Sequence, residues 1–136
     1  MHLAATSVGN VALFAGGDTA GSGPSRAVDI YNSATGVWST AQLSVARIQL
    51  AATSVGDVAI FAGGQSPPSN VVDLFKLSTG TWTTAQLSVG RYLLAATSVG
   101  NVALFAGGYG GALLCQEGEG RANVDVCVCF ECFLRL

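Results

Sequence analysis

Four cysteines near the C-terminus are the side chains in this sequence with the most obvious chemistry. Cys127, Cys129 and Cys132 form the pattern C-x-C-x-x-C, and Cys115 lies upstream. Four thiolates can bind zinc, but such sites usually have two separated C-x-x-C pairs. On a strand, Cys127 and Cys129 would also point to the same side, which gives a cramped site. We therefore predict no metal site and no cofactor, and interpret these cysteines as apolar residues.

The other reactive side chains do not form a catalytic arrangement. The single histidine is His2, so no serine or cysteine elsewhere in the chain has a histidine partner for a triad. Asp29 and Asp73 stand at equivalent places in two copies of an internal repeat, whereas an acid/base pair needs two different environments. We predict no catalytic residue and no enzymatic activity.

Composition favours a folded domain and argues against two classes of ligand. Half of the 136 residues are hydrophobic and 10% are charged, which is not the composition of a disordered chain. The net charge is −2 and the six basic residues are scattered, so nothing attracts nucleic acid or an anionic membrane. No run approaches about 18 apolar residues, so we predict no transmembrane helix.

The elements that would position any site come from a repeated sequence. LAATSVGNVALFAGG begins at Leu3, returns with two changes at Leu50, and returns unchanged at Leu94. A second block, VDIYNSATGVWSTAQLSVAR at 28–47, matches 72–91. The segments between the blocks, 18–27 and 65–71, differ in length, so we interpret them as loops.

Each copy divides into strand-like pieces separated by turn residues. The pair Gly9-Asn10 suits a hairpin turn in which both central residues take positive φ. The second piece, VALFA, is apolar on both faces and must therefore be covered on both sides. The predicted strands of the first copy are residues 3–9, 11–17, 27–32 and 37–43.

A set of spaced features resembles the Kelch repeat. Paired glycines end an apolar strand, an aromatic residue follows, a tryptophan comes seven residues later, and an arginine lies in the connection to the next copy. The resemblance covers residues 3–108 and implies an all-β fold of Kelch-type β-propeller blades, each a four-stranded antiparallel sheet. The residues that carry it are Gly16, Gly17, Tyr31, Trp38, Arg47, Gly63, Gly64, Phe75, Trp82, Arg91, Gly107 and Gly108.

The resemblance also implies a structural role for each of these residues. The glycines allow strands to pack closely where a Cβ would intrude. The aromatic residues fill the space between blades, so Trp38 and Trp82 are expected in the core. Arg47 and Arg91 are expected to hydrogen-bond between blades rather than to a ligand.

The array is incomplete compared with a closed propeller. After residues 124–126, which echo 28–30, the match is lost. We expect a fragment of a larger propeller, a shortened product, or a chain that self-associates to complete a ring. The predicted array covers 1–126, with blade 1 at about 3–47, blade 2 at about 50–91 and a partial blade 3 at about 94–126, and an atypical Cys-rich apolar tail covers 127–136.

Function in propellers resides in loops rather than in the repeated strands. The segments after the paired glycines should emerge on one face, which in the Kelch family commonly binds a partner protein. We therefore predict a protein–protein interaction module without catalytic activity, whose protein partner is unidentified and which binds neither nucleic acid nor membrane. The polar candidates in segments 18–27, 65–71 and 109–123 are Asp18, Arg26, Gln65, Asn70, Glu117 and Arg121.

Two alternatives stay open at this point. One is a fragment of a propeller enzyme acting on sugars, resembling the sialic-acid mutarotases or galactose oxidase, although the copper type needs histidines that this chain lacks. The other is a non-functional truncated duplicate. Cysteine-free repeats and no evident signal favour the cytoplasm, although a truncated start would hide a signal.

Overall fold

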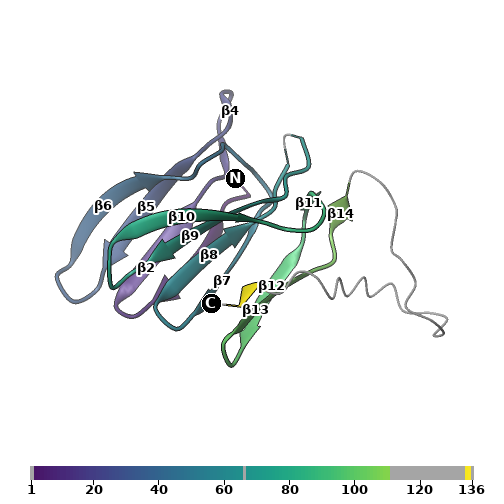
Figure 1. Cartoon of the computed structure of the whole chain (residues 1–136). Coiled ribbons are helices and arrows are strands. Elements are labelled where there is room, and N and C mark those ends of the chain that lie inside the picture. Colours follow the sequence, from purple (N-terminus) through teal and green to yellow (C-terminus); the bar gives the residue numbers. More distant parts are fainter. Residues whose placement is uncertain (1, 66, 111–133, 136) are drawn as a thin grey trace.

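The computed structural model describes residues 2–65, 67–110 and 134–135. Within these residues the structure contains strands and no helix, and the strands form antiparallel sheets, none of them closed (Figure 1). The predicted all-β class is therefore confirmed. Because the described part of the chain has no helix, it also has none that could cross a membrane.

Two four-stranded sheets have the same strand order, which follows the chain. The first sheet consists of β1 (Ala4–Val8), β2 (Val11–Ala15), β5 (Ala27–Asn32) and β6 (Val37–Gln42). The second sheet consists of β7 (Ala51–Val55), β8 (Val58–Ala62), β9 (Val71–Lys76) and β10 (Thr81–Gln86). All four predicted strands of the first copy are present, because apolar and β-branched residues alternate with turn residues where the chain reverses.

The third copy and the connecting segments form smaller sheets. The third sheet joins β12 (Ala95–Val99), β13 (Val102–Ala106) and β15 (Leu134–Arg135). Within the predicted loop 18–27, β3 (Asp18–Thr19) and β4 (Gly23–Pro24) form a small hairpin. Elsewhere, β11 (Arg91–Tyr92) pairs with β14 (Tyr109–Gly110). The predicted strand at 124–126 and most of the Cys-rich tail lie outside the described residues.

The hairpin turns differ in one respect from the prediction. Only Gly9 of the pair Gly9-Asn10 has positive φ, at 54°, and the same holds for Gly56 at 56° and Gly100 at 55°. Positive φ at the first central residue alone is the pattern of a type II′ turn. The expectation of positive φ at both positions is wrong, because asparagine carries a Cβ that disfavours this region while glycine does not.

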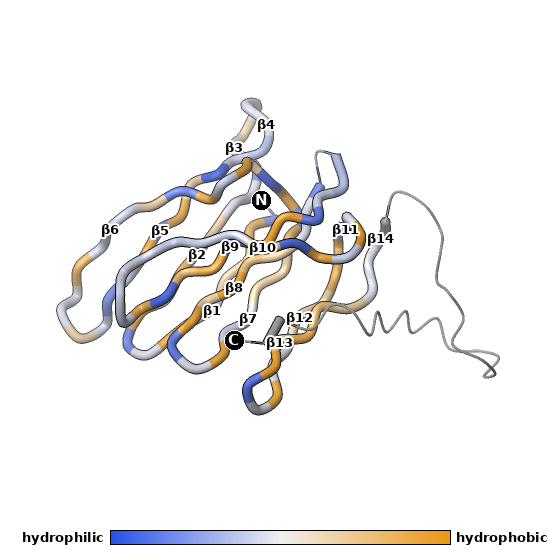
Figure 2. Tube along the Cα trace, viewed as in Figure 1, coloured by the Kyte–Doolittle hydropathy of each residue, from blue (hydrophilic) through white to orange (hydrophobic). Residues whose placement is uncertain are grey.

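The three sheets stack side by side through their first strands. Strand β7 contacts β1 on one side and β12 on the other. Figure 2 shows that the inner strand β8 consists mostly of hydrophobic residues, whereas the outer strand β10 has intermediate hydropathy and the hairpin turns carry hydrophilic residues. The sheets therefore share their hydrophobic cores with their neighbours, and none has a core of its own.

Burial of both faces is complete for β8. Ala59 and Phe61 belong to a cluster with Leu13 and Val28 of the first sheet. Ile60, on the opposite face, belongs to a second cluster with Leu94, which precedes β12, and with Phe105 of the third sheet. Every residue of β8 is buried, as predicted for an apolar strand covered on both sides.

A chain of backbone hydrogen bonds links the three copies just before their first strands. The N–H of Gln49 donates to the carbonyl of His2 at 3.0 Å, and the N–H of Leu93 donates to the carbonyl of Gln49 at 3.0 Å. All three residues have positive φ, at 66°, 57° and 56° in chain order. Non-glycine residues rarely adopt this conformation, so its repetition marks the same structural feature in each of the three copies.

In the first two copies, the first glycine of the pair allows a backbone carbonyl of the following connection to approach the strand end closely. A Cβ on Gly63 would lie 2.6 Å from the carbonyl oxygen of Arg91, and a Cβ on Gly16 would lie 2.7 Å from that of Arg47. The predicted packing role is thus confirmed at these two positions. Gly107, in the third copy, has open space around it in the described structure.

We expect Gly63→Ala to destabilise the protein more than Gly80→Ala does. Both glycines have nearly the same φ, 69° and 67°, but a Cβ on Gly80 meets nothing within 4 Å. Gly80→Ala should cost about 1–2 kcal/mol for the left-handed backbone. Gly63→Ala should lose a further roughly 1–3 kcal/mol of stability, because the added Cβ overpacks against the carbonyl oxygen of Arg91. Urea unfolding measures both values, and equal losses would contradict the close-approach argument.

Candidate functional site

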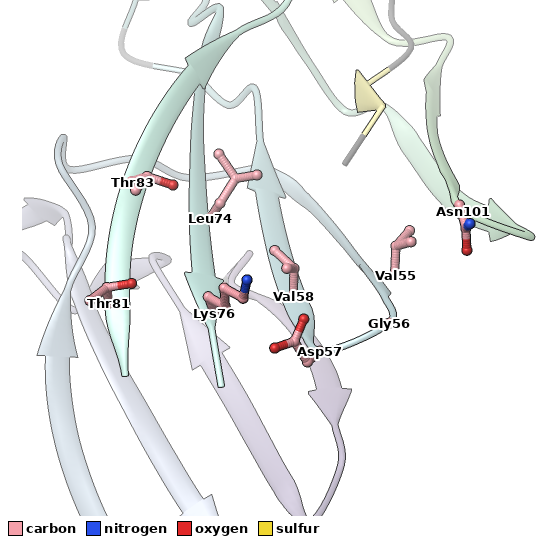
Figure 3. Close-up of a pocket in the computed structure, with 9 residues that line it drawn as sticks. All are labelled: Val55, Gly56, Asp57, Val58, Leu74, Lys76, Thr81, Thr83 and Asn101. Carbon is pink, nitrogen blue, oxygen red and sulfur yellow. The ribbon is translucent and has the colours of Figure 1, made fainter. Parts of the chain in front are cut away.

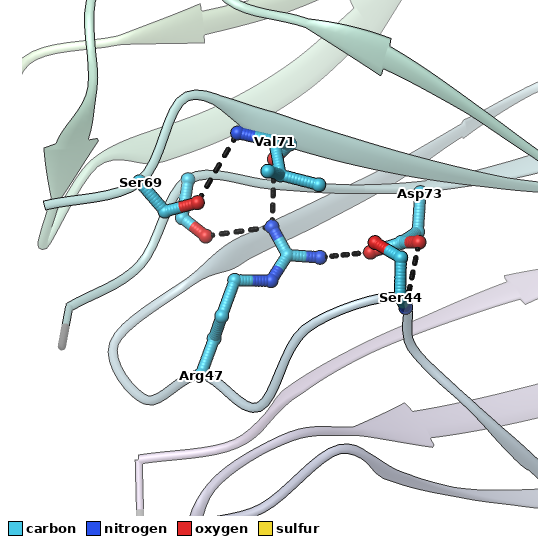
Figure 4. A network of polar contacts seen from close by, with 6 residues as sticks. Ser44, Arg47, Ser69, Val71 and Asp73 are labelled. Atoms are coloured by element: carbon cyan, nitrogen blue, oxygen red, sulfur yellow. Dashed lines mark hydrogen bonds and ion pairs between the residues drawn. The ribbon is translucent and has the colours of Figure 1, made fainter. Parts of the chain in front are cut away.

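The guanidinium of Arg47, in the connection between β6 and β7, lies at the middle of a buried network of hydrogen bonds. Its side chain is 1% exposed. Its Nη1 donates to the carbonyl oxygens of Gly63 at 2.8 Å and Val71 at 2.6 Å, and its Nη2 donates to the Asp73 carboxylate (Figure 4). The connection that leaves the first sheet is thereby fixed to two strand ends and one strand of the second sheet.

Asp73 completes this network from the middle of β9. One of its carboxylate oxygens accepts the Arg47 bond, and the other accepts the backbone N–H of Ser44 at 3.0 Å. Burial lowers the pKa of the Arg47 guanidinium, and the charge of Asp73 opposes that shift. Since both side chains are buried and bonded to the fold, we assign the pair to structure rather than to ligand binding.

Arg91 repeats this arrangement at the next connection. It is buried, and its Nη1 donates to the carbonyl oxygen of Gly107 at 2.7 Å. The expectation that Arg47 and Arg91 hydrogen-bond to the following copy is therefore confirmed. Asp29, which stands in the first sheet where Asp73 stands in the second, is exposed.

We expect Asp73→Ala to cost about 3–5 kcal/mol of stability, because it leaves the Arg47 charge buried without its counter-ion. Arg47→Met should also destabilise, since it removes the bonds to Gly63 and Val71. The double variant should lose clearly less than the sum of the two single losses. Chemical denaturation of all four proteins gives the coupling energy, and additive losses would contradict a coupled pair.

The aromatic residues of the first two sheets have the same mutual arrangement but different surroundings. In the second sheet the ring centroid of Trp82 lies 5.1 Å from Phe75 and 6.2 Å from Phe61, and Trp82 packs against the cluster shared with the first sheet. In the first sheet Trp38 lies 4.9 Å from Tyr31.

For Trp38 the predicted core position is wrong in the single chain. Trp38 is 60% exposed and Phe14 is 37% exposed. The physical reason is that Trp82 has the first sheet packed against it, whereas no described residue covers the corresponding face of the first sheet. Sequence reasoning missed this open face because the two copies have almost the same residues there.

A pocket of about 460 Å³ opens between the second and third sheets at their hairpin ends (Figure 3). Between the first and second sheets the Leu77 side chain lies next to Gly9, while a Cβ on the equivalent Gly56 would meet nothing. The pocket is therefore a part of an inter-sheet boundary that the described residues leave open. It is lined by Val55, Gly56, Asp57, Val58, Leu74, Lys76, Thr81, Thr83 and Asn101.

The pocket has one notable electrostatic feature. The Ser78 hydroxyl donates a hydrogen bond to the Asp57 carboxylate, which lowers the pKa of Asp57, and the charge of Lys76 acts in the same direction. An ionised carboxylate held in this way is a poor general base, because catalysis near neutral pH favours a pKa close to the working pH. The pocket thus offers apolar contacts together with one carboxylate, Asp57, and one ammonium group, Lys76.

The predicted loop residues fall into three groups. Asp18 and Arg26 are exposed, at the hairpin formed by β3 and β4. Gln65 and Asn70 are half-buried, and their backbones are engaged, since Gln65 N–H donates to Ile48 and the carbonyl of Asn70 accepts from Leu87. The remaining two candidates, Glu117 and Arg121, lie outside the described residues.

Comparison with known proteins does not extend these observations. No model of a protein family matches this sequence, and no curated protein matches it. Within residues 2–65, 67–110 and 134–135, no group of three metal-ligating side chains comes together. The cysteines considered as zinc ligands, Cys115, Cys127, Cys129 and Cys132, lie outside that part of the chain.

Proposed function

We propose that this chain is part of a Kelch-type β-propeller and acts as a protein-binding module rather than an enzyme. Three features support the propeller: identical strand order in two sheets, neighbouring first strands, and an arginine that ties each connection to the following sheet. Radial repetition of such four-stranded sheets builds a propeller.

The observation that carries the binding role is the exposed hairpin of residues 18–27. It follows β2 and projects from the end of the first sheet (Figure 1), with Asp18 and Arg26 exposed. The segments after β8 and β13 leave the same ends of the second and third sheets. The pocket lies at the opposite, hairpin-turn ends, where Gly56 and Asn101 line it. A projecting ribbon suits a protein surface, whereas small molecules bind mostly in concave sites.

A structural role for the buried charges supports the non-catalytic part of the proposal. Arg47, Asp73 and Arg91 are the buried charged residues among those described. Each bonds across a boundary between copies, as shown above. Their low exposure leaves them inaccessible to a substrate, whereas catalytic groups need to reach one.

We expect Arg26→Glu to weaken partner binding by about tenfold, because reversing a charge at the rim of an interface opposes complementarity. The measurement is affinity capture from the cell of origin followed by titration of the partner identified. Lys76→Glu, at the opposite end of the second sheet, is the control and should bind as the unchanged protein does. Circular dichroism confirms that both variants fold.

Two results would contradict the proposal. One is a partner that binds equally well to the Arg26→Glu variant and loses affinity for the Lys76→Glu variant, since that would place binding at the pocket end. The other is interconversion of sialic-acid anomers by the purified chain above the uncatalysed rate, which would favour the sugar-enzyme alternative.

A further inference from the structure

The first and third sheets each have one apolar face that no described residue covers. On the first sheet this face, which we call the aromatic face, presents Ala5, Ala12, Phe14, Tyr31 and Trp38, and the exposed Asp29, which pairs with Phe14, lies on the same face. On the third sheet the uncovered face, which we call the aliphatic face, consists of Ala95, Thr97, Val99, Val102, Leu104 and Ala106. Ala95, Thr97 and Val99 are exposed there, and Val99 is 65% exposed. Exposed apolar patches of this kind mark interaction sites.

The aromatic face repeats a surface whose partner is already visible in this chain. Its residues correspond to Ala52, Ala59, Phe61, Phe75 and Trp82 of the second sheet, as the sequence repeat aligns them. In the second sheet all five pack against the cluster that contains β1 and β2 of the first sheet. Phe61, the equivalent of Phe14, is 0% exposed there.

The aliphatic face repeats the other half of the same boundary. Val99, Val102 and Leu104 correspond to Val8, Val11 and Leu13 of the first sheet. Those three residues are buried against the second sheet, and Leu13 is 0% exposed. The aliphatic face thus repeats the β1–β2 part of an interface that the chain forms internally, while the other parts of that interface, such as Val28 and Leu43, have no counterpart among the described residues of the third copy.

The backbone offers a matching pair of groups at the same boundary. His2 accepts from Gln49, and Gln49 accepts from Leu93, so the internal series runs from copy to copy. One further step of the series would join the N–H at the position of His2 to the carbonyl of Leu93. The first and third copies therefore match each other in backbone hydrogen bonding as well as in apolar surface.

We propose that two copies of this chain bind head to tail, with the aromatic face of each packed on the aliphatic face of the other, to close a ring. The described residues of each copy contribute three stacked sheets, the third with three strands instead of four, so two copies give six, within the range of about four to eight found in propellers. Three sheets are too few for a ring and nine would be too many. The contact is heterologous and is formed twice, which closes the dimer.

The test is size-exclusion chromatography with light scattering on the full chain and three variants. Trp38→Asp and Leu104→Asp each place a charge in one of the two faces. Val37→Asp is the matched control, because Val37 precedes Trp38 on β6, points to the opposite face, and is similarly exposed, at 58% against 60%.

We expect the unchanged chain and Val37→Asp to have twice the mass of one chain. Trp38→Asp and Leu104→Asp should each weaken dimerisation by roughly thirtyfold or more. An equimolar mixture of these two variants should recover a dimer. In the mixture, the intact aromatic face of the Leu104→Asp copy can pack on the intact aliphatic face of the Trp38→Asp copy, while the second contact carries both charges, so the recovered dimer is held by one contact and is weaker than that of the unchanged chain. This recovery also shows that both variants fold.

Four results would overturn the proposal. A monomeric unchanged chain with a cooperative thermal melt would mean that something other than a second copy covers the two faces. Polydisperse or filamentous material would mean that the contact does not close at two copies. A Trp38→Asp variant that stays dimeric would place the contact elsewhere, and a mixture that associates no more than either variant alone would exclude a head-to-tail contact.

Discussion

The structure depends on one constraint: its central strand is apolar on both faces and must be covered by a sheet on each side. Phe61 and Ile60, neighbours on β8, belong to two different clusters, one shared with the first sheet and one with the third. Burial of apolar surface is the main favourable term in folding, and here it is gained only between sheets. Repetition of the sequence is therefore a physical requirement, since each copy supplies a face that its neighbour needs.

The polar interactions set the geometry of this stacking. Arg47 reaches from the connection after the first sheet to the second, where Asp73 and two carbonyl groups hold it. A buried pair of this kind contributes little net free energy, but it penalises any other arrangement of the two sheets. The glycines act in the same place: Gly16 and Gly63 let the arginine-bearing connections approach the strand ends closely. Apolar burial holds the sheets together, and the arginine and the glycines fix their relative position.

The two interaction surfaces that we infer occupy different parts of the molecule. Partner binding is assigned to the hairpin at one end of the first sheet, which bears Asp18 and Arg26. Self-association is assigned to the faces of the first and third sheets. A closed dimer would leave the hairpins exposed, because they extend from the sheet ends rather than from the faces. The dimer would then present two copies of the binding segment, one from each chain, which raises effective affinity for a repeated or dimeric partner.

The sequence by itself determined the four main strands of each full copy, the positions of their hairpin turns, the two-sided burial of VALFA and the positions of the paired glycines, because these follow from local alternation and from glycine chemistry. It also predicted that Arg47 would bond to the next copy. Tertiary structure decided what the repeat could not distinguish. Trp38 and Trp82 have nearly the same local sequence, yet one is open and the other packed, because burial depends on the neighbouring sheet. His2, Gln49 and Leu93, three different side chains, likewise share a positive φ at the places where hydrogen bonds join the copies, and neither the bonds nor the conformation were predicted from the sequence.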